Sequence, residues 1–387
     1  MKYWRGYLTA LIFAAITWAL MQFGQNFTGL VDMIYPYVIR TLQNMLAQWS
    51  SSVDFVVWQM LLMAMVVLGL ATAVLMIVLK WNPIQWFGWI LAAASGVYML
   101  YILLFGLNYF AGPLADDIRL ETGYYNLEEL TEAAEYYRDK ANALAELVNR
   151  DAEGNVDFAD FDTLSTQTGN GFHTLTYDYS YSVFAGETLP VKALSWADWY
   201  TKRGITGITM GLTGEACVNP NIPEILLPFA MSHEMAHRMC IYTEEDANFA
   251  AFLAGHVNES LEYQYSAYFM AYRYCYMSLV NANTPEAAAA AARVNNSVGS
   301  KLYQDMYTYT NFFSKTRGSG TSATSTSRTE DGFVSYGKVT DLLVSWHIQQ
   351  IVLPSITVVE DPFDPFDLNQ VDLGNSTTPT ETTEGTE

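Results

Sequence analysis

Cysteine and basic residues are scarce in this 387-residue sequence. Three cysteines, Cys217, Cys240 and Cys275, are too few for a disulfide framework, and we expect them to be buried thiols. The 19 basic residues are outnumbered by 40 acidic ones, which gives a formal charge of -21. This balance argues against a nucleic-acid partner, because the phosphates would be repelled. We therefore expect the partners to be proteins, peptides or cations.

Charge is nearly absent from the first 110 residues of the chain. The charged side chains of this part are Lys2, Arg5, Asp32, Arg40, Asp54 and Lys80. The later part carries the other 15 of the 19 bases and the other 38 of the 40 acids. We infer an apolar environment for the first part and an aqueous one for the rest.

Three apolar stretches, residues 7–23, 55–79 and 86–110, contain no Asp, Glu, Lys, Arg or His. A helix of roughly 20 residues crosses the ~30 Å hydrocarbon layer, so each stretch is predicted to span a membrane, and residues 1–110 to form a membrane domain. The lack of ionisable residues inside the spans argues against a transporter. No small-x-small cleavage motif follows the first stretch, which favours an uncleaved anchor over a signal peptide.

The few basic residues predict the orientation of the spans. If three helices alternate across the membrane, Lys2, Arg5 and Lys80 lie on one side and Arg40 lies on the other. Basic residues favour the cytoplasmic side, so we expect a multi-pass cell-membrane protein with a cytoplasmic amino terminus. The large carboxy-terminal domain is then extracytoplasmic.

Helices are predicted for much of the chain outside the spans. Residues 24–54 include an amphipathic helix expected to lie at the membrane interface or to pack on the spans. Residues 126–150 are rich in helix formers, with Asn126 as the cap, and Pro285 opens an alanine-rich helix. Helical periodicity returns at residues 336–352.

Other segments lack a helical pattern. Residues 151–188 are predicted to be a loop-rich connection, and residues 314–332 to be flexible. Two β-prone runs, 205–210 and 215–219, flank a glycine-rich turn and predict a hairpin. Residues 357–387 are expected to form a disordered acidic tail rich in Thr and Pro.

The segment PFAMSHEMAH places two histidines four residues apart around a glutamate. Residues with this spacing share one face of a helix, so His233 and His237 can direct ring nitrogens toward one zinc ion. Glu234 is positioned to take a proton from a water whose pKa zinc lowers to about 7. The spacing therefore predicts a zinc site with Glu234 as the catalytic base.

A third zinc ligand is needed, because catalytic zinc usually has three protein ligands. The longer pattern His-Glu-x-x-His-x-x-Gly-x-x-His fails, since Cys240 and Thr243 occupy the positions of its Gly and last His. A carboxylate is therefore expected from the acidic cluster Glu244, Glu245 and Asp246. Alternatively, these acids complement the dipole of a second helix that Thr243 caps.

Glu244 is the favoured third ligand. Asn248 lies four residues later on the same helical face, where its side chain could orient a ligand histidine. Hydrolysis also needs a donor for the oxyanion, and the residues that follow leave several candidates open. They are His256, Tyr265, Tyr268 and Arg273.

A short strand is expected beside the histidine-bearing helix. In zinc peptidases an edge strand next to that helix binds the extended substrate backbone, and residues 215–219 are the candidate. An ordinary packed strand is an equal alternative. The predicted substrate-binding residues are Glu215, Ala216, Cys217, Val218 and Asn219.

Six sequence blocks resemble one known family in their order: GLNYFAGPLA, TGEACVN, PFAMSHEMAH, EEDANFAAFLA, YSAYFMAYRY and SYGKVTDLL. Between residues 106 and 343 the chain is similar to the bacterial membrane-protein family catalogued as domain of unknown function 3810, and HEMAH followed by EEDANF looks like the gluzincin pattern. The resemblance implies a zinc metallopeptidase with ligands His233, His237 and Glu244 and catalytic Glu234. The segment RMCIY departs from the family, which more often has a glycine there, and leaves the turn between the helices open.

Together these features predict three amino-terminal transmembrane helices and a mainly α-helical, α+β zincin-like metallopeptidase domain at residues 111–356, with a short hairpin or edge strand beside the HExxH helix. The expected function is that of a membrane-anchored zinc endopeptidase with one Zn2+ ion and a protein or peptide substrate. The alternative is a noncatalytic membrane receptor or assembly factor that retains zinc as a structural clasp. The sequence predicts neither the cleavage specificity nor the oligomeric state.

Overall fold

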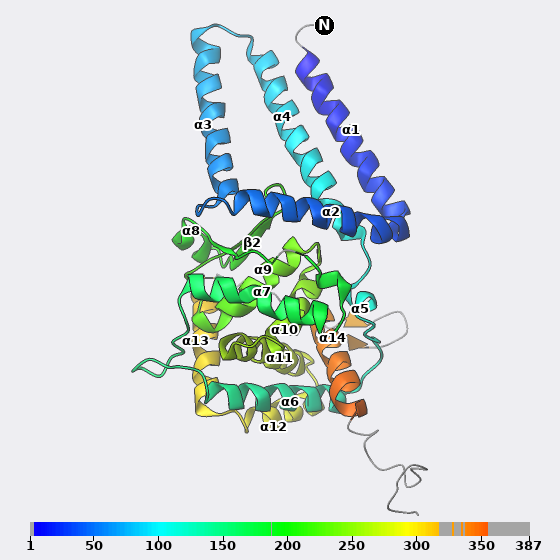
Figure 1. Cartoon of the computed structure of the whole chain (residues 1–387), viewed down its shortest axis with the longest axis vertical. Helices are drawn as coiled ribbons and strands as arrows, with labels where there is room; N and C mark the ends of the chain where they lie inside the picture. The colour runs from blue at the N-terminus through cyan, green and yellow to red at the C-terminus, as the bar shows by residue number, and fades with distance from the viewer. Residues whose placement is uncertain (1–3, 187, 317–326, 329–333, 336, 355–387) are drawn as a thin grey trace, which may run out of the picture.

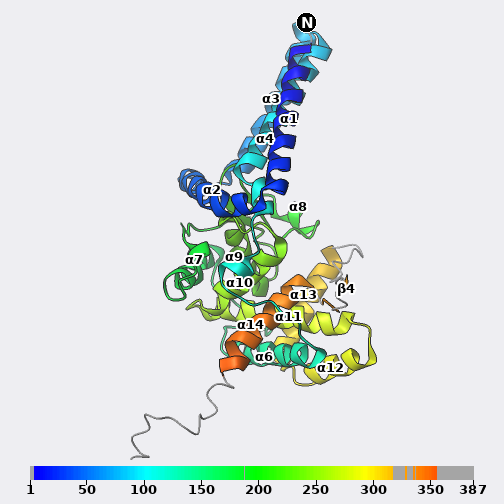
Figure 2. The same cartoon turned by 90° about the vertical axis from the view of Figure 1, so that its right-hand side faces the viewer.

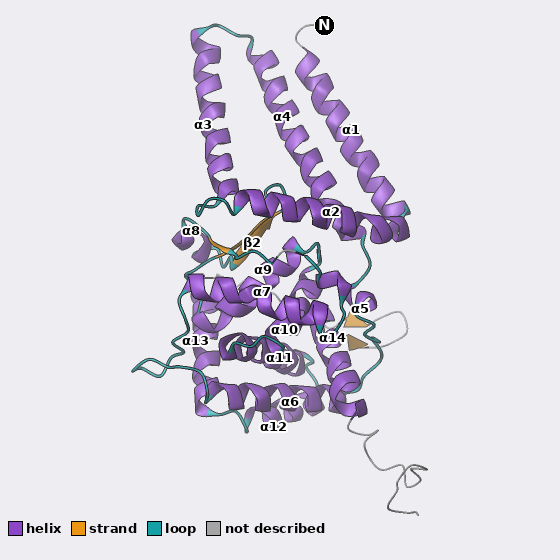
Figure 3. Cartoon of the chain, viewed as in Figure 1, coloured by secondary structure: helices purple, strands orange, loops and turns teal. Residues whose placement is uncertain are grey.

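The computed structural model describes residues 4–186, 188–316, 327–328, 334–335 and 337–354 (Figure 1). The described chain is mainly helical with a small sheet, as predicted (Figure 3). Apolar helices extend from one end of the molecule, and the remaining helices form a body below them (Figure 1). The body contains the histidine motif.

In the described residues, three helices are long and apolar enough to span a membrane. They are α1 (Arg5–Asn26), α3 (Val57–Val78) and α4 (Pro83–Leu104). Helices α1 and α4 pack closely at Gly6, where an added Cβ would lie 2.5 Å from the backbone of Gly88. These helices support membrane anchoring, as predicted.

The third span ends earlier than predicted. We expected it to reach residue 110, but α4 stops at Leu104, and Gly106–Phe110 forms the 3-10 helix η2. This helix packs against α2 (Thr28–Ser50). Residues 106–110 therefore do not continue the third span.

Helix α2 lies across the ends of the spans, between them and the body (Figures 1 and 2). One face of α2 is buried, and the amide of Gln43 donates to the carbonyls of Leu104 and Gly211. At Gly214, φ is +66°, and an added Cβ would lie 2.6 Å from the backbone nitrogen of Ala47. The predicted amphipathic helix is therefore confirmed as a helix, and its buried face contacts the hairpin turn of the body.

The body is built around three mutually packed helices, α9 (Leu227–Arg238), α10 (Glu244–His256) and α11 (Leu261–Asn281). Helix α6 (Leu127–Ala145) covers α11 and begins at the predicted cap, where Asn126 and Glu129 form a reciprocal capping box. The other α-helices are α5 (Leu114–Asp117), α7 (Phe161–Tyr177), α8 (Ala197–Thr201), α12 (Pro285–Asn295), α13 (Ser300–Thr316) and α14 (Lys338–His347). Short 3-10 helices η3 (Ser182–Phe184) and η4 (Glu224–Leu226) and the π-helix η5 (Ile348–Val352) complete the helical elements of the described chain.

Helix α7 corrects the predicted loop-rich connection at residues 151–188. Asp160 caps this helix by accepting a hydrogen bond from the backbone of Thr163. Its glycines are packing sites: a Cβ on Gly171 would lie 1.9 Å from the carbonyl oxygen of Ala254 in α10. The glycines that indicated a loop instead permit close helix packing.

The main sheet has the strand order β1-β3-β2 and comprises β1 (Lys192–Ala193), β2 (Gly207–Met210) and β3 (Glu215–Val218). Strands β2 and β3 are antiparallel, which confirms the predicted hairpin. Strand β3 also pairs with β1 in parallel, so it is central and its prediction as an edge strand was wrong. The edge beside α9 is formed by β2.

A second described sheet pairs β4 (Ser327–Arg328) with β5 (Val334–Ser335). Most of the predicted flexible segment, residues 317–326 and 329–332, lies outside the described residues. The predicted acidic tail, residues 357–387, also lies outside them.

The body is joined to span α3 through the buried carboxylate of Glu215. The carboxylate of Glu215 accepts hydrogen bonds from the backbone nitrogens of Val57 at 2.8 Å and Trp58 at 2.9 Å. Lys192 donates to the same carboxylate at 2.9 Å, and both side chains are largely buried. The first backbone N–H groups of a helix have no partner within the helix and favour a negative charge. Glu215 therefore caps the span from within the sheet.

Candidate metal centre

Helix α9 carries the two histidines of the motif on one face. Pro228 occupies its first turn, where the missing N–H removes no helical hydrogen bond. The rings of His233 and His237 are nearly perpendicular, with centroids 4.6 Å apart. Strands β2 and β3 pack on one side of α9, and α10 and α11 pack on others, so these histidines are held by a well-supported helix.

Glu244, the first residue of α10, faces both rings. One of its carboxylate oxygens lies 3.3 Å from Nε2 of His233, and the other lies 3.7 Å from Nε2 of His237. In the described residues these three side chains form the group whose ligand atoms lie within 4.8 Å of one another. Asp246 instead exchanges hydrogen bonds with Thr243 at the helix cap. The structure thus brings Glu244, rather than Asp246, to the histidines.

The separations fit a zinc ion. Two ligand atoms about 2.0–2.1 Å from one tetrahedral ion are separated by roughly 3.3 Å. The His237 ring pairs its Nδ1 with the carbonyl oxygen of Ile241 at 2.8 Å, which leaves the lone pair of Nε2 available for a metal. Two imidazoles and a carboxylate are a donor set that zinc accepts, with room for a fourth ligand.

The turn between the two helices positions Ile241. Cys240, in the RMCIY segment between the helices, has a φ of +72°, the left-handed conformation that favours glycine. The backbone nitrogen of Ile241 bonds to the carbonyl of Ala236, which closes the end of α9. The turn therefore has a left-handed backbone at a residue with a side chain, which is a strained conformation.

The predicted role of Asn248 is not met in the structure. Asn248 forms no hydrogen bond with His233 or His237 within the described residues, and the backbone of Ile241 orients His237 instead. Nδ1 of His233 is buried without a hydrogen-bond partner in that part of the chain. A carbonyl in a turn carries no side-chain signal, which is why sequence reasoning missed it.

The charges of the group influence one another. The rings of His233 and His237, whose Nε2 atoms lie 3.3 Å and 3.7 Å from its carboxylate, hold the pKa of Glu244 below its usual value. Burial opposes the charged form of His237, but Glu244, Glu234 and the Ile241 carbonyl raise its pKa overall. Glu244 is therefore ionised and available as a ligand near neutral pH.

Glu234 is the buried acid of the motif, with 5% of its surface exposed. Burial raises its pKa, while the two histidines and the hydroxyl of Thr209 act in the opposite direction. Its carboxylate lies against β2: a Cβ on Gly207 would approach Oε1 to 2.4 Å. A carboxyl group with a raised pKa next to two imidazoles is suited to accept and return a proton.

Thr209 is a site residue that the sequence did not indicate. Its hydroxyl lies 2.8 Å from Oε2 of Glu234 and 2.8 Å from the carbonyl oxygen of the same residue. A hydroxyl has one proton but two lone pairs, so it can donate to ionised Oε2, or accept from protonated Oε2 and donate to the carbonyl. Thr209 can therefore hydrogen-bond to both protonation states of Glu234.

The predicted substrate-binding strand does not offer its residues to a ligand. Ala216, Cys217 and Val218 are buried in the centre of the sheet. Glu215 accepts hydrogen bonds from the first backbone nitrogens of span α3. The amide of Asn219 donates to Thr201 and Ile205. These residues are structural.

The four candidate oxyanion donors are likewise used elsewhere. In the described part of the chain, none of them has a hydrogen bond or ring contact with the group of His233, His237 and Glu244. Tyr265 donates to Asp305, Arg273 lies over the ring of Tyr309, and Tyr268 and His256 pack with Phe252.

His256 belongs to an aromatic cluster, and this predicts a pH-dependent stability. Its ring stacks on Phe252 and contacts Trp346 and Tyr268, and burial lowers its pKa from 6.5 to about 4. A neutral buried histidine stabilises the fold above pH 6.5, and this contribution is lost as pH falls toward 4. At ~1.4 kcal/mol per pKa unit, the loss reaches roughly 3 kcal/mol.

We expect His256→Phe to reduce the difference between the thermal midpoints at pH 7.5 and pH 5, because phenylalanine retains the ring stacking without the titration. The exposed His173 provides the control, since His173→Phe should leave that difference unchanged. An equal pH dependence in the His256→Phe variant and the parent would contradict the assignment.

Comparison with known families assigns the chain to a family. Residues 31–344 match the family model described as Protein of unknown function (DUF3810). No curated protein and no solved structure matches the chain. The matched range runs from α2 into α14 and includes every residue of the candidate metal centre. Since the match covers more than half of the sequence, the chain belongs to the DUF3810 family of proteins of unknown function.

Proposed function

We propose that this protein is a membrane-anchored, zinc-dependent metallopeptidase with a zincin-like body. The observation that carries the proposal is the convergence of His233, His237 and Glu244 beside the buried acid Glu234. A structural clasp would need the ligands, but it would have no use for a buried carboxylate with a raised pKa next to them. This combination favours catalysis over the noncatalytic alternative.

His233, His237 and Glu244 would hold the ion. When bound, zinc would supply Lewis-acid polarisation of a peptide carbonyl and lower the pKa of a water molecule. Glu234 acts as the base that accepts the proton of the attacking water, with Oε2 held by Thr209. The carboxyl then returns the proton to the leaving amine from its other oxygen, while the Thr209 hydroxyl holds Oε2.

The substrate backbone is proposed to bind along β2. This strand is the edge of the main sheet beside α9, it is only half-buried, and it carries Gly207 and Thr209 next to Glu234. An extended peptide can add to such an edge through backbone hydrogen bonds. A protein or peptide segment in extended form is therefore the proposed substrate.

The body is proposed to lie outside the cytoplasm. Arg5 begins α1 and Lys80 lies between α3 and α4, at the ends of the spans that point away from the body (Figure 1). Basic side chains at these ends favour the cytoplasmic face. Helix α2 would then lie at the outer surface of the bilayer.

The test uses the full-length chain in detergent, loaded with zinc. We expect about one zinc ion per chain, as a site of three protein ligands implies, and hydrolysis of peptides from a mixed library. 1,10-Phenanthroline should abolish hydrolysis, and added zinc should restore it. The His233→Ala/His237→Ala double variant is the control and should contain no zinc. A zinc-loaded parent that leaves the whole library intact would contradict catalysis and favour the structural clasp.

A further inference from the structure

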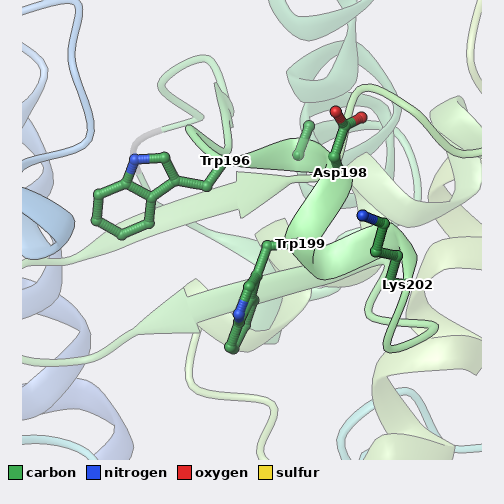
Figure 4. Close-up of a pocket in the computed structure, with 5 residues that line it drawn as sticks. Trp196, Asp198, Trp199 and Lys202 are labelled. Carbon is green, nitrogen blue, oxygen red and sulfur yellow. The ribbon is translucent and has the colours of Figure 1, made fainter.

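A tryptophan-rich corner of the body is solvent-exposed in the structure. Trp196 directly precedes the short helix α8, and Trp199 lies within it. The two residues are 48% and 49% exposed, and they line a shallow pocket with Lys202. Their rings project away from the side chains of Asp198 and Lys202 (Figure 4). Each of these two indoles exposes a large apolar area to solvent. Two such areas in one short segment are typical of a surface that binds a partner.

This corner is attached to the first turn of span α3. The backbone nitrogen of Ser195 donates to Oε1 of Gln59 at 3.0 Å, and the Gln59 amide donates to the Ser195 carbonyl and the Tyr200 hydroxyl, both at 3.1 Å. Leu194 and Tyr200 also pack against Trp58 in a small apolar cluster. The two tryptophans are therefore adjacent to the point where a span leaves the body, which is the level of a bilayer surface.

Basic groups accompany the indoles in this otherwise acidic chain. The guanidinium of Arg203 lies 3.6 Å from the centroid of the Trp199 ring and donates to the Trp199 carbonyl, and Lys202 is exposed. The carboxylate of Asp198, which adds negative charge here, accepts a hydrogen bond from Asn221 at 2.8 Å. Cations beside interfacial indoles complement anionic headgroups.

The backbone of Trp196 has an unusual conformation. Its φ of +59° places a large aromatic residue in the left-handed region, which is strained relative to an ordinary conformation. Left-handed backbone at a bulky residue is retained where surrounding interactions compensate for it. An indole at a membrane interface gains such an interaction, since tryptophan prefers the headgroup level.

We propose that Trp196 and Trp199 insert into the headgroup region of the bilayer spanned by α1, α3 and α4, and that Lys202 and Arg203 bind its anionic lipids. The proposal rests on membrane anchoring and is independent of peptidase activity. The corner holds the main sheet, through β1 and the segment after it, at a fixed distance from the bilayer surface.

The experiment measures immersion depth by spin labelling of the full-length chain in nanodiscs of phosphatidylcholine and phosphatidylglycerol. The native cysteines Cys217, Cys240 and Cys275 are buried, so a label on Trp199→Cys reports on one site. The control is Tyr303→Cys on α13, which is 61% exposed and belongs to the body away from the spans (Figure 1).

We expect the ratio of oxygen to nickel-chelate accessibility to be several-fold higher at position 199 than at position 303, because oxygen concentrates in lipid and the chelate in water. Adding Lys202→Glu and Arg203→Glu should lower the ratio at position 199 in these anionic nanodiscs. Equal ratios at the two labelled sites would overturn insertion. An unchanged ratio after the charge reversals would overturn the anionic-lipid part.

Discussion

Replacing Glu234 with glutamine is expected to lower kcat/KM for peptide cleavage by about 10²–10⁴-fold while leaving the zinc content unchanged. The amide has nearly the same shape, and its oxygen can still accept from Thr209, so the fold around α9 should persist. What is lost is the basic oxygen that accepts a proton. Initial rates with a fluorogenic peptide and metal analysis of the same sample measure both quantities.

Glu245→Gln is the matched control for this prediction. Glu245 follows Glu244 in α10, but it is not part of the group formed with the histidines in the described residues. Its replacement should therefore leave both cleavage and zinc content as in the parent. Parental cleavage by Glu234→Gln would remove Glu234 from the reaction and leave the motif as a metal clasp.

Removing the carboxylate of Glu215 is expected to destabilise the folded protein by about 3–5 kcal/mol. Glu215→Ala leaves the ammonium of Lys192 buried beside it without its counter-charge, although Lys192 still donates to the carbonyls of Ser50 and Phe55. It also exposes the backbone nitrogens of Val57 and Trp58 without a cap. The free energy of unfolding in a mild detergent, followed by circular dichroism, measures the loss.

Glu146→Ala provides the control, because Glu146 pairs with Lys301 at an exposed position. Such pairs are screened by solvent, so we expect no measurable loss of stability. If the Glu215→Ala and Glu146→Ala variants had the same free energy of unfolding, Glu215 would not be what joins the sheet to α3.

Much of this architecture follows from local patterns in the sequence. The spans are uncharged runs of sufficient length, and all three are helices in the structure. The facing of His233 and His237 follows from helical periodicity. Glu244 lies near His233 and His237 because a tight turn joins α9 to α10. The acidic cluster follows that turn directly, so the sequence could predict a carboxylate as the third ligand.

Errors arose where distant segments decide the structure. Strand β3 is central because the two-residue strand β1 joins its far side, and so short a strand has no recognisable pattern. Helix α7 was missed because Gly171 suggests a loop until its contact with α10 is known. Thr209 approaches Glu234 across the gap between β2 and α9, a pairing that neither segment encodes alone.

The hydrogen bonds between Glu215 and the start of α3 connect a membrane span to the sheet that contacts Glu234. A span tilts more in a thin bilayer and less in a thick one. Because α3 is fastened to β3, and β3 is paired with the strand that carries Thr209, such a tilt would shift the hydrogen-bond donor of Glu234. Through this chain of contacts, a change of membrane thickness would alter the hydrogen bond that Glu234 receives from Thr209.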